Sequence, residues 1–238
     1  MNASRIALAF AVGVVVAAGA LRAAAESNVE LAQEPPLRLV LHLDDRAVEL
    51  AAGRTDRIDL PGGEARVRVE LLPDRRLDLA YVAFDYPAYF DFTHRSPSPN
   101  ADRWTVGGDG VQVSVDRIAG GIDADTYREQ VRSTGERVLA DSLLKTEPIS
   151  QELGGRILTG FRHTTRHNVG QIEQTMLFDY LFFTHQGQTG CLLMVYPADA
   201  AGPDGAHTRV RRQIADSWAW QEPKPQPEPG DAEPANAP

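Results

Sequence analysis

The two histidines closest to each other in the sequence are His163 and His167, and paired imidazoles are a common start for a metal site. The residues around them have the pattern of a strand, in which four residues span ~13 Å at ~3.3 Å per residue. That separation is too large for one metal ion unless the strand ends between the two histidines. We therefore interpret the pair as the solvated end of a strand, and the sequence predicts neither a metal site nor a cofactor.

The single cysteine, Cys191, lies in a run of large apolar residues. A nucleophilic thiol needs a partly exposed, electropositive setting that lowers its pKa, whereas a thiol inside an apolar strand behaves as a small hydrophobic side chain. We predict that Cys191 is buried and inert. One cysteine cannot form an internal disulfide, so the stability of the fold must come from its core.

Four aspartates accompany the predicted strands and could supply a pair of carboxylates for acid–base catalysis: Asp85, Asp91, Asp116 and Asp179. Glycoside hydrolysis, for example, needs two carboxyl groups within ~10 Å of each other. No spacing in the sequence selects such a pair, and neither a Gly-x-Ser-x-Gly motif nor a phosphate-binding glycine loop occurs. The sequence therefore assigns no catalytic residue.

Aromatic side chains gather at Tyr86, Tyr89, Phe90 and Trp104 and could form a stacking platform for sugars. They alternate with polar residues as the residues of buried strands do, which favours a place in the core or in the lining of a cleft. We keep Tyr86, Tyr89 and Trp104 as the candidate cleft or partner surface.

These residues must be positioned by a sheet, and the centre of that sheet is the hairpin at residues 175–196. Two runs, 175–183 and 191–196, are apolar on both faces and flank a polar turn that contains Gly187. Glycine allows the backbone conformation that a tight hairpin turn needs. Strands that are apolar on both faces lie in the middle of a sheet covered on both sides.

Two helices are predicted to provide that cover. The first begins at Asp123 or Asp125 and ends at Gly135, because aspartate caps helix starts and glycine helix ends. The second spans residues 206–220, and its apolar stripe consists of Val210, Ile214 and Trp218.

Residues 37–73 predict a small antiparallel β unit in which Val67, Val69 and Leu71 face inward. So short a unit has few residues for a core of its own, so it should pack on the larger domain at 80–220. The predicted fold class is α+β: a central antiparallel sheet with helices packed on its faces, plus this N-terminal β unit.

The two ends have the composition of segments outside the fold. Residues 1–25 combine Arg5, an uncharged run at 6–21 and three alanines before Glu26, which predicts a cleaved signal peptide. The run is shorter than the ~20 residues of a membrane span, so no span is expected after cleavage, although an uncleaved anchor is the alternative. Residues 26–36 read as a linker. Residues 221–238 hold six prolines and four acids and predict a disordered tail.

The element order of residues 80–220 resembles the PsbP-like and DcrB-like superfamily. The resemblance is carried by the aromatic segment 84–92, the strand at 111–118, one helix, an antiparallel meander, and a final helix with Ile214-Ala215-Asp216-Ser217-Trp218. It implies an α/β/α sandwich and a protein that binds other proteins or stabilises assemblies. The superfamily shares no catalytic residues, so the resemblance assigns none here.

The formal net charge of −9 argues against sequence-independent binding to nucleic acid or to anionic lipid. Together these features predict a periplasmic or secreted, non-catalytic binding or accessory protein of the cell envelope with a protein partner. One alternative is an exported hydrolase that uses carboxylates in a cleft lined by Tyr86, Tyr89 and Trp104. Another is a small-molecule carrier, which would need an apolar pocket beneath the final helix.

Overall fold

The computed structural model describes residues 33–43, 46–52, 67–169 and 172–222, with only the backbone described at Val67 and Val169. The predicted signal peptide, most of the predicted linker and nearly all of the predicted tail lie outside the described residues.

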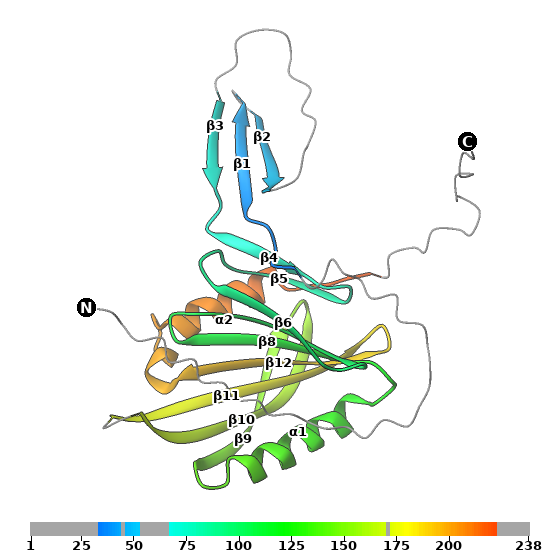
Figure 1. Cartoon of the computed structure of the whole chain (residues 1–238), viewed down its shortest axis with the longest axis vertical. Coiled ribbons are helices and arrows are strands. Elements are labelled where there is room, and N and C mark those ends of the chain that lie inside the picture. The colour runs from blue at the N-terminus through cyan, green and yellow to red at the C-terminus, as the bar shows by residue number, and fades with distance from the viewer. Residues whose placement is uncertain (1–32, 44–45, 53–66, 170–171, 223–238) are drawn as a thin grey trace, which may run out of the picture.

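The body of the molecule is built on a seven-stranded antiparallel sheet (Figure 1). Sequence neighbours form hairpins on both sides of it, and the pair β8–β12 joins the two halves. In spatial order the strands are β6 (Asp91–Ser98), β7 (Ala101–Gly108), β8 (Val111–Ile118), β12 (Gln188–Pro197), β11 (Ile172–His185), β10 (Arg156–Val169) and β9 (Leu143–Leu153).

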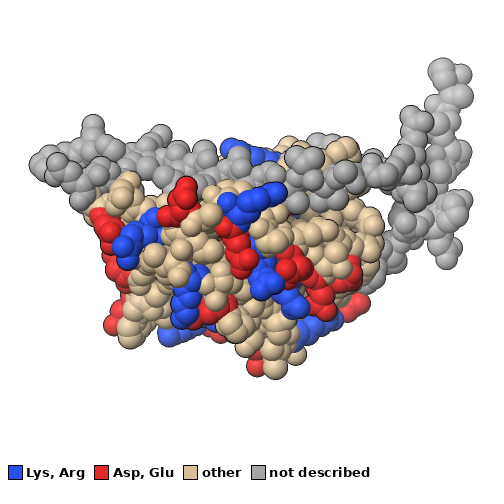
Figure 2. Space-filling model, turned by 90° about the horizontal axis from the view of Figure 1, so that it is seen from below, with Lys and Arg blue, Asp and Glu red and all other residues tan. Residues whose placement is uncertain are grey.

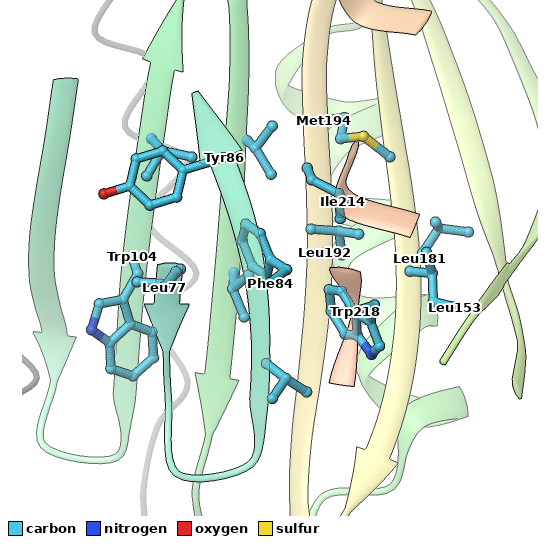
Figure 3. Close-up of a cluster of buried hydrophobic side chains, with 14 of the residues drawn as sticks. Leu77, Phe84, Tyr86, Trp104, Leu153, Leu181, Leu192, Met194, Ile214 and Trp218 are labelled. Carbon is cyan, nitrogen blue, oxygen red and sulfur yellow. The ribbon is translucent and has the colours of Figure 1, made fainter. Parts of the chain in front are cut away.

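One face of the large sheet is covered by a three-stranded sheet together with helix α2 (Ala206–Ser217). The small sheet has the order β13 (Ala219–Trp220), β5 (Val82–Pro87) and β4 (Asp74–Asp78). Between the layers lies the main hydrophobic core, part of which is shown in Figure 3. Its largest wholly buried members include Trp104, Tyr86, Phe84, Leu192 and Ile214.

The other face carries helix α1 (Ala124–Val138) and a second, smaller cluster. Asp123 caps this helix as predicted, because its Oδ1 accepts a hydrogen bond from the Thr126 backbone N–H at 2.8 Å. Tyr127 of α1 packs edge-on against Phe182 of β11, with ring centroids 5.6 Å apart. The helix continues past Gly135 to Val138.

The central hairpin is confirmed. Strands β11 and β12 are joined by Gln186 and Gly187, both with positive φ (52° and 69°), the backbone of a two-residue turn that suits the twist of the strands. Side chains on both faces of the hairpin are buried, since Leu181 and Met194 belong to the main core and Tyr180 and Cys191 to the smaller cluster.

The prediction of an α+β fold with helices packed on the sheet faces is wrong. The described chain is mostly antiparallel β-sheet, with two α-helices among the described residues, and a second sheet supplies much of the cover on one face. Strands β4, β6 and β9 account for the difference. Strand β4 reads as a charged connector, and β6 and β9, the two edges of the large sheet, contain Pro97 and Pro148. Charge and proline are common on edge strands because they discourage pairing with other chains, so these sequences resemble loops.

A third sheet, at the N-terminal end, stands apart from these layers (Figure 1). Its strands are β2 (Arg46–Ala51), β1 (Arg38–Leu43) and β3 (Val67–Leu71), in that order, and both pairings are antiparallel. It is attached to the body where β3 is followed directly by β4. At this base Arg38 Nη1 lies 3.5 Å from an Asp74 oxygen and 3.4 Å from an Asp85 oxygen.

Candidate functional site

The structure separates the three aromatic residues proposed as a cleft or partner surface. Tyr86 and Trp104 are wholly buried members of the main core, and burial raises the pKa of Tyr86 to about 12. Tyr89 follows the end of β5, is 64% exposed, and its hydroxyl donates a hydrogen bond to Asp109 at 2.7 Å. These residues therefore share no surface on which a ligand could stack.

Asp116 lies on the α1 side of the large sheet and is held by an ion pair. The Arg103 guanidinium, from the neighbouring strand β7, donates to both carboxylate oxygens at 2.5 and 2.7 Å. The Tyr127 hydroxyl of α1 reaches the same carboxylate at 3.4 Å. Directly opposite in the sheet is Cys191, which is 1% exposed; burial raises its pKa, and the prediction that it is buried is confirmed.

Asp179 has the same arrangement on the α2 side of the sheet. Arg162 of β10 donates to both of its oxygens at 2.5 and 2.8 Å, and the Tyr196 hydroxyl donates to it at 2.9 Å. His207, in the first turn of α2, stacks on the Tyr196 ring with centroids 3.4 Å apart and planes 9° from parallel. Its Nε2 has no hydrogen-bond partner among the described residues.

The four aspartates do not form an acid–base pair. Asp116 and Asp179 lie on opposite faces of the sheet, and each is neutralised by an arginine. Asp85 is paired with Arg76 and Arg38, and Asp91 is exposed at the start of β6. A general acid needs a raised pKa and a place beside the substrate, so these ion pairs suit structural roles.

The interpretation of His163 as part of a solvated strand end is wrong, because its side chain is wholly buried. Its Nδ1 is hydrogen-bonded to the Thr146 hydroxyl at 2.9 Å, and burial lowers its pKa. A Cβ atom at Gly135 would lie 2.8 Å from its Nε2, so this glycine makes room for the imidazole and does not end the helix. His167 is hydrogen-bonded to the Thr165 hydroxyl. The described residues contain no cluster of three or more histidine, cysteine or acidic side chains suited to a metal ion.

The stability of the protein is expected to fall between pH 7.5 and pH 5. Burial lowers the pKa of His207 from its ordinary 6.5 to about 4, with Asp179 opposing the shift. Between these values the unfolded chain binds a proton that the folded protein does not. The stabilisation is therefore complete above about pH 6.5 and is lost as the pH falls toward about 4. At pH 5 the loss from His207 alone should be ~2 kcal/mol, and His163 adds to it in the same direction.

Urea unfolding at the two pH values measures this loss, and His207→Phe is the matched variant because phenylalanine keeps the stacking on Tyr196. The variant should lose less stability than the wild type over the same interval. Equal losses of stability in both proteins would mean that His207 has the same pKa in the folded and unfolded states, which would contradict the prediction.

The N-terminal sheet presents a face made entirely of aliphatic side chains apart from Arg46. In the antiparallel register, Leu39 is opposite both Leu50 and Leu71, and Leu41 is opposite both Val48 and Val69, so all of them point to one side. We call this surface the N-terminal apolar face and define it by Leu39, Leu41, Leu43, Val48, Leu50, Val69 and Leu71.

This face is not covered by the body of the protein. Val69 is 60% exposed and Leu71 55% exposed, and of the seven residues only Leu43 is buried. None of them belongs to the two core clusters or to the partly buried side chains packed against those clusters. The predicted inward orientation of Val69 and Leu71 is therefore wrong, although the predicted alternation of apolar and polar residues holds.

The opposite face of this sheet holds charged side chains that pair with one another, together with Val40 and two alanines. Arg38 donates to Glu49 at 2.5 Å, and Arg68 donates to Glu70 at 2.8 Å. Soluble proteins rarely leave a contiguous apolar face uncovered unless it binds something. The N-terminal apolar face is therefore the candidate functional site. One signal for this site was present in the sequence, because the β unit is too short for a core of its own. The structure adds that no described segment supplies a second apolar layer for the unit.

No protein-family model matches the chain, and no curated protein sequence does. Among solved structures, the chain is similar to the crystal structure of LpqN, described as involved in cell envelope biogenesis of Mycobacterium tuberculosis. The identity is 13%, the alignment covers 59% of this chain and 83% of that one, and the TM-score is 0.35.

Within the described residues, no helix combines the length and the apolar character needed to cross a membrane.

Proposed function

We propose that the protein is a non-catalytic binding or accessory protein of the cell envelope, periplasmic or secreted, whose N-terminal apolar face contacts a partner protein. The observation that carries the proposal is the exposure of Val69 and Leu71 on an otherwise aliphatic sheet face. The signal-like composition of residues 1–25 supports export.

The charges and the packing of the body favour a binding protein over a hydrolase, a small-molecule carrier or a nucleic-acid-binding protein. The carboxylates with catalytic potential are paired with arginines on opposite faces of the sheet, which does not favour a hydrolase. The space beneath α2 is filled by Ile214 and Trp218, which does not favour a carrier with its pocket there. Figure 2 shows basic and acidic side chains interspersed over one face of the body, a distribution that does not favour nucleic acid.

The proposal is tested by photo-crosslinking in cells of the source organism. A crosslinking amino acid is placed at position 69, 71 or 157 of the full chain, and crosslinked products are identified in the envelope fraction. Position 157 is the comparison, because Ile157 is 72% exposed near the start of β10, in the body of the protein. We expect one envelope protein to be captured through position 69 or 71 and not through position 157. A chain that stays in the cytoplasm, or that captures no protein through position 69 or 71, would contradict the proposal.

A further inference from the structure

We infer that the N-terminal apolar face binds one amphipathic α-helix of its partner, about three turns long, with an aliphatic stripe and an acidic residue near the end that meets Arg46. This inference rests on the proposed function and adds the kind of partner.

The dimensions of the face match one helix. Strands of five or six residues are ~16–20 Å long at ~3.3 Å per residue, and the outer two of three strands lie ~10 Å apart. A helix is ~10–12 Å wide and rises 1.5 Å per residue, so about 12 residues cover the length of the strands.

A helix also packs on a three-stranded sheet elsewhere in this protein. The small sheet β13-β5-β4 also has three strands, and the 12-residue helix α2 packs on its central strand β5. Helix α2 uses Val210 and Ile214, four residues apart, and Trp218 directly at its end, all of them buried. A helix with large apolar residues at this spacing therefore packs on the central strand of a three-stranded sheet in this chain, and the N-terminal sheet lacks such a helix among the described residues.

A second copy of the same face fits less well. Sheets that pack face to face keep their strands within about 30° of each other, so two copies have two main ways to pair. Arg46 lies beside Leu43 at one end of the face, is exposed, and pairs with no acidic group among the described residues. In one arrangement β2 would lie over β3 of the second copy, and Arg46 would face the end of that strand; in the other β2 would lie over β2 running in the opposite direction, and Arg46 would face Leu50. Both arrangements leave a cation uncompensated, whereas an acidic residue on a helix compensates it.

A lipid surface fits less well too. The face has no tryptophan or tyrosine, the residues that anchor proteins at membrane interfaces, and the net charge of the chain is −9.

The test uses the full chain and three synthetic 14-residue peptides. The first carries leucines spaced as Val210, Ile214 and Trp218 are, with a glutamate near one end; the second replaces this glutamate by lysine; the third is a scrambled version of the first. Fluorescence anisotropy measures affinity, and amide chemical shifts locate the binding site. We expect the glutamate peptide to bind at least tenfold more tightly than the scrambled peptide and to shift amides of β1 and β3.

Three variants of the N-terminal sheet and one control variant test whether the binding uses this face. Val69→Glu should weaken binding tenfold or more, and Val69→Ser, which adds no charge, should weaken it severalfold. Ile157→Glu is the matched control at an exposed apolar residue elsewhere and should leave the affinity unchanged. Arg46→Glu should reverse the preference between the glutamate and lysine peptides. Circular dichroism and melting curves verify that each variant is folded.

The inference is overturned if the scrambled peptide binds equally well or if Val69→Glu leaves binding unchanged. It is also overturned if the protein forms a dimer in sedimentation, or floats with phosphatidylcholine vesicles, and Val69→Glu abolishes that association. Capture of a partner through position 69 or 71, together with equal binding of the scrambled peptide, would overturn this inference and leave the proposed function intact. Capture through position 157 and not through 69 or 71 would overturn both. Specific peptide binding without any partner captured in cells would contradict only the cellular role.

Discussion

Trp218→Ala is expected to lower the free energy of unfolding by ~3–5 kcal/mol, the usual cost of truncating a large aromatic residue in a core. Trp218 follows the last residue of α2, is 5% exposed, and stacks on Phe84 of β5 with ring centroids 5.6 Å apart and planes 3° from parallel. Its ring also meets Phe183 of β11 edge-on at 6.0 Å, so it joins the small sheet, the helix and the large sheet. Because whole domains hold only ~5–15 kcal/mol, the variant should be close to unfolding at room temperature.

Trp220→Ala is the matched comparison and should cost less, ~1–3 kcal/mol, because Trp220 is only partly buried. Trp220 is nevertheless packed against the main core. Its indole N–H donates to the Gly154 carbonyl at 3.1 Å, its ring lies 5.5 Å from that of Trp218, and the Arg156 guanidinium lies 4.5 Å from its centre. Urea midpoints of the two variants decide the order, and a larger loss for Trp220→Ala would contradict the packing described here.

Arg162→Met is expected to cost ~3–5 kcal/mol, because it removes the partner of a buried charge. The Asp179 side chain is 2% exposed and would keep only the Tyr196 hydroxyl as a hydrogen-bond donor of those that contact it now. The equivalent change on the opposite face, Arg103→Met, should cost less, because the Asp116 side chain is 9% exposed and has more access to water.

The double variant Arg162→Met/Asp179→Leu separates loss of the ion pair from loss of packing. Replacing both members of a buried pair by apolar residues is often neutral, so the double variant should recover most of the stability lost in Arg162→Met. Denaturation midpoints of the wild type, Arg162→Met, Asp179→Leu and the double variant give the coupling energy between the two side chains. If the double variant is as unstable as Arg162→Met, the loss of stability in Arg162→Met comes from lost packing of the arginine side chain.

The sequence predicted the features that rest on local pattern. The hairpin β11–β12 is visible because its side chains are apolar on both faces, and the cap at Asp123 because aspartate before a helical pattern is a strong start signal. Val210, Ile214 and Trp218 are all buried as predicted, but the predicted helix over 206–220 is too long: it ends at Ser217, Trp218 follows it, and Ala219–Trp220 forms strand β13. These features depend on residues close together in the chain.

What the sequence did not reveal depends on contacts between distant segments. Gly135 looks like a helix terminator, and only the position of His163 on a strand beneath it explains why glycine stands inside the helix. The partners of Asp116 and Asp179 are arginines on neighbouring strands, so no local spacing identifies them. Val69 and Leu71 have the alternation of a covered strand, and only the placement of the other layers shows that nothing in the body covers them.

The strand order also determines how the large sheet can assemble. Each half of it, β6-β7-β8 and β12-β11-β10-β9, is a meander of sequence neighbours that can form from local hairpins. The seam between the halves pairs Ile118 with Thr189, and β13 reaches β5 by pairing Ala219 with Ala83, so both contacts close long loops. Non-local pairings of this kind slow folding. During synthesis β8 keeps one unpaired edge until β12 emerges, so the sheet is completed last at its centre and not at its rims.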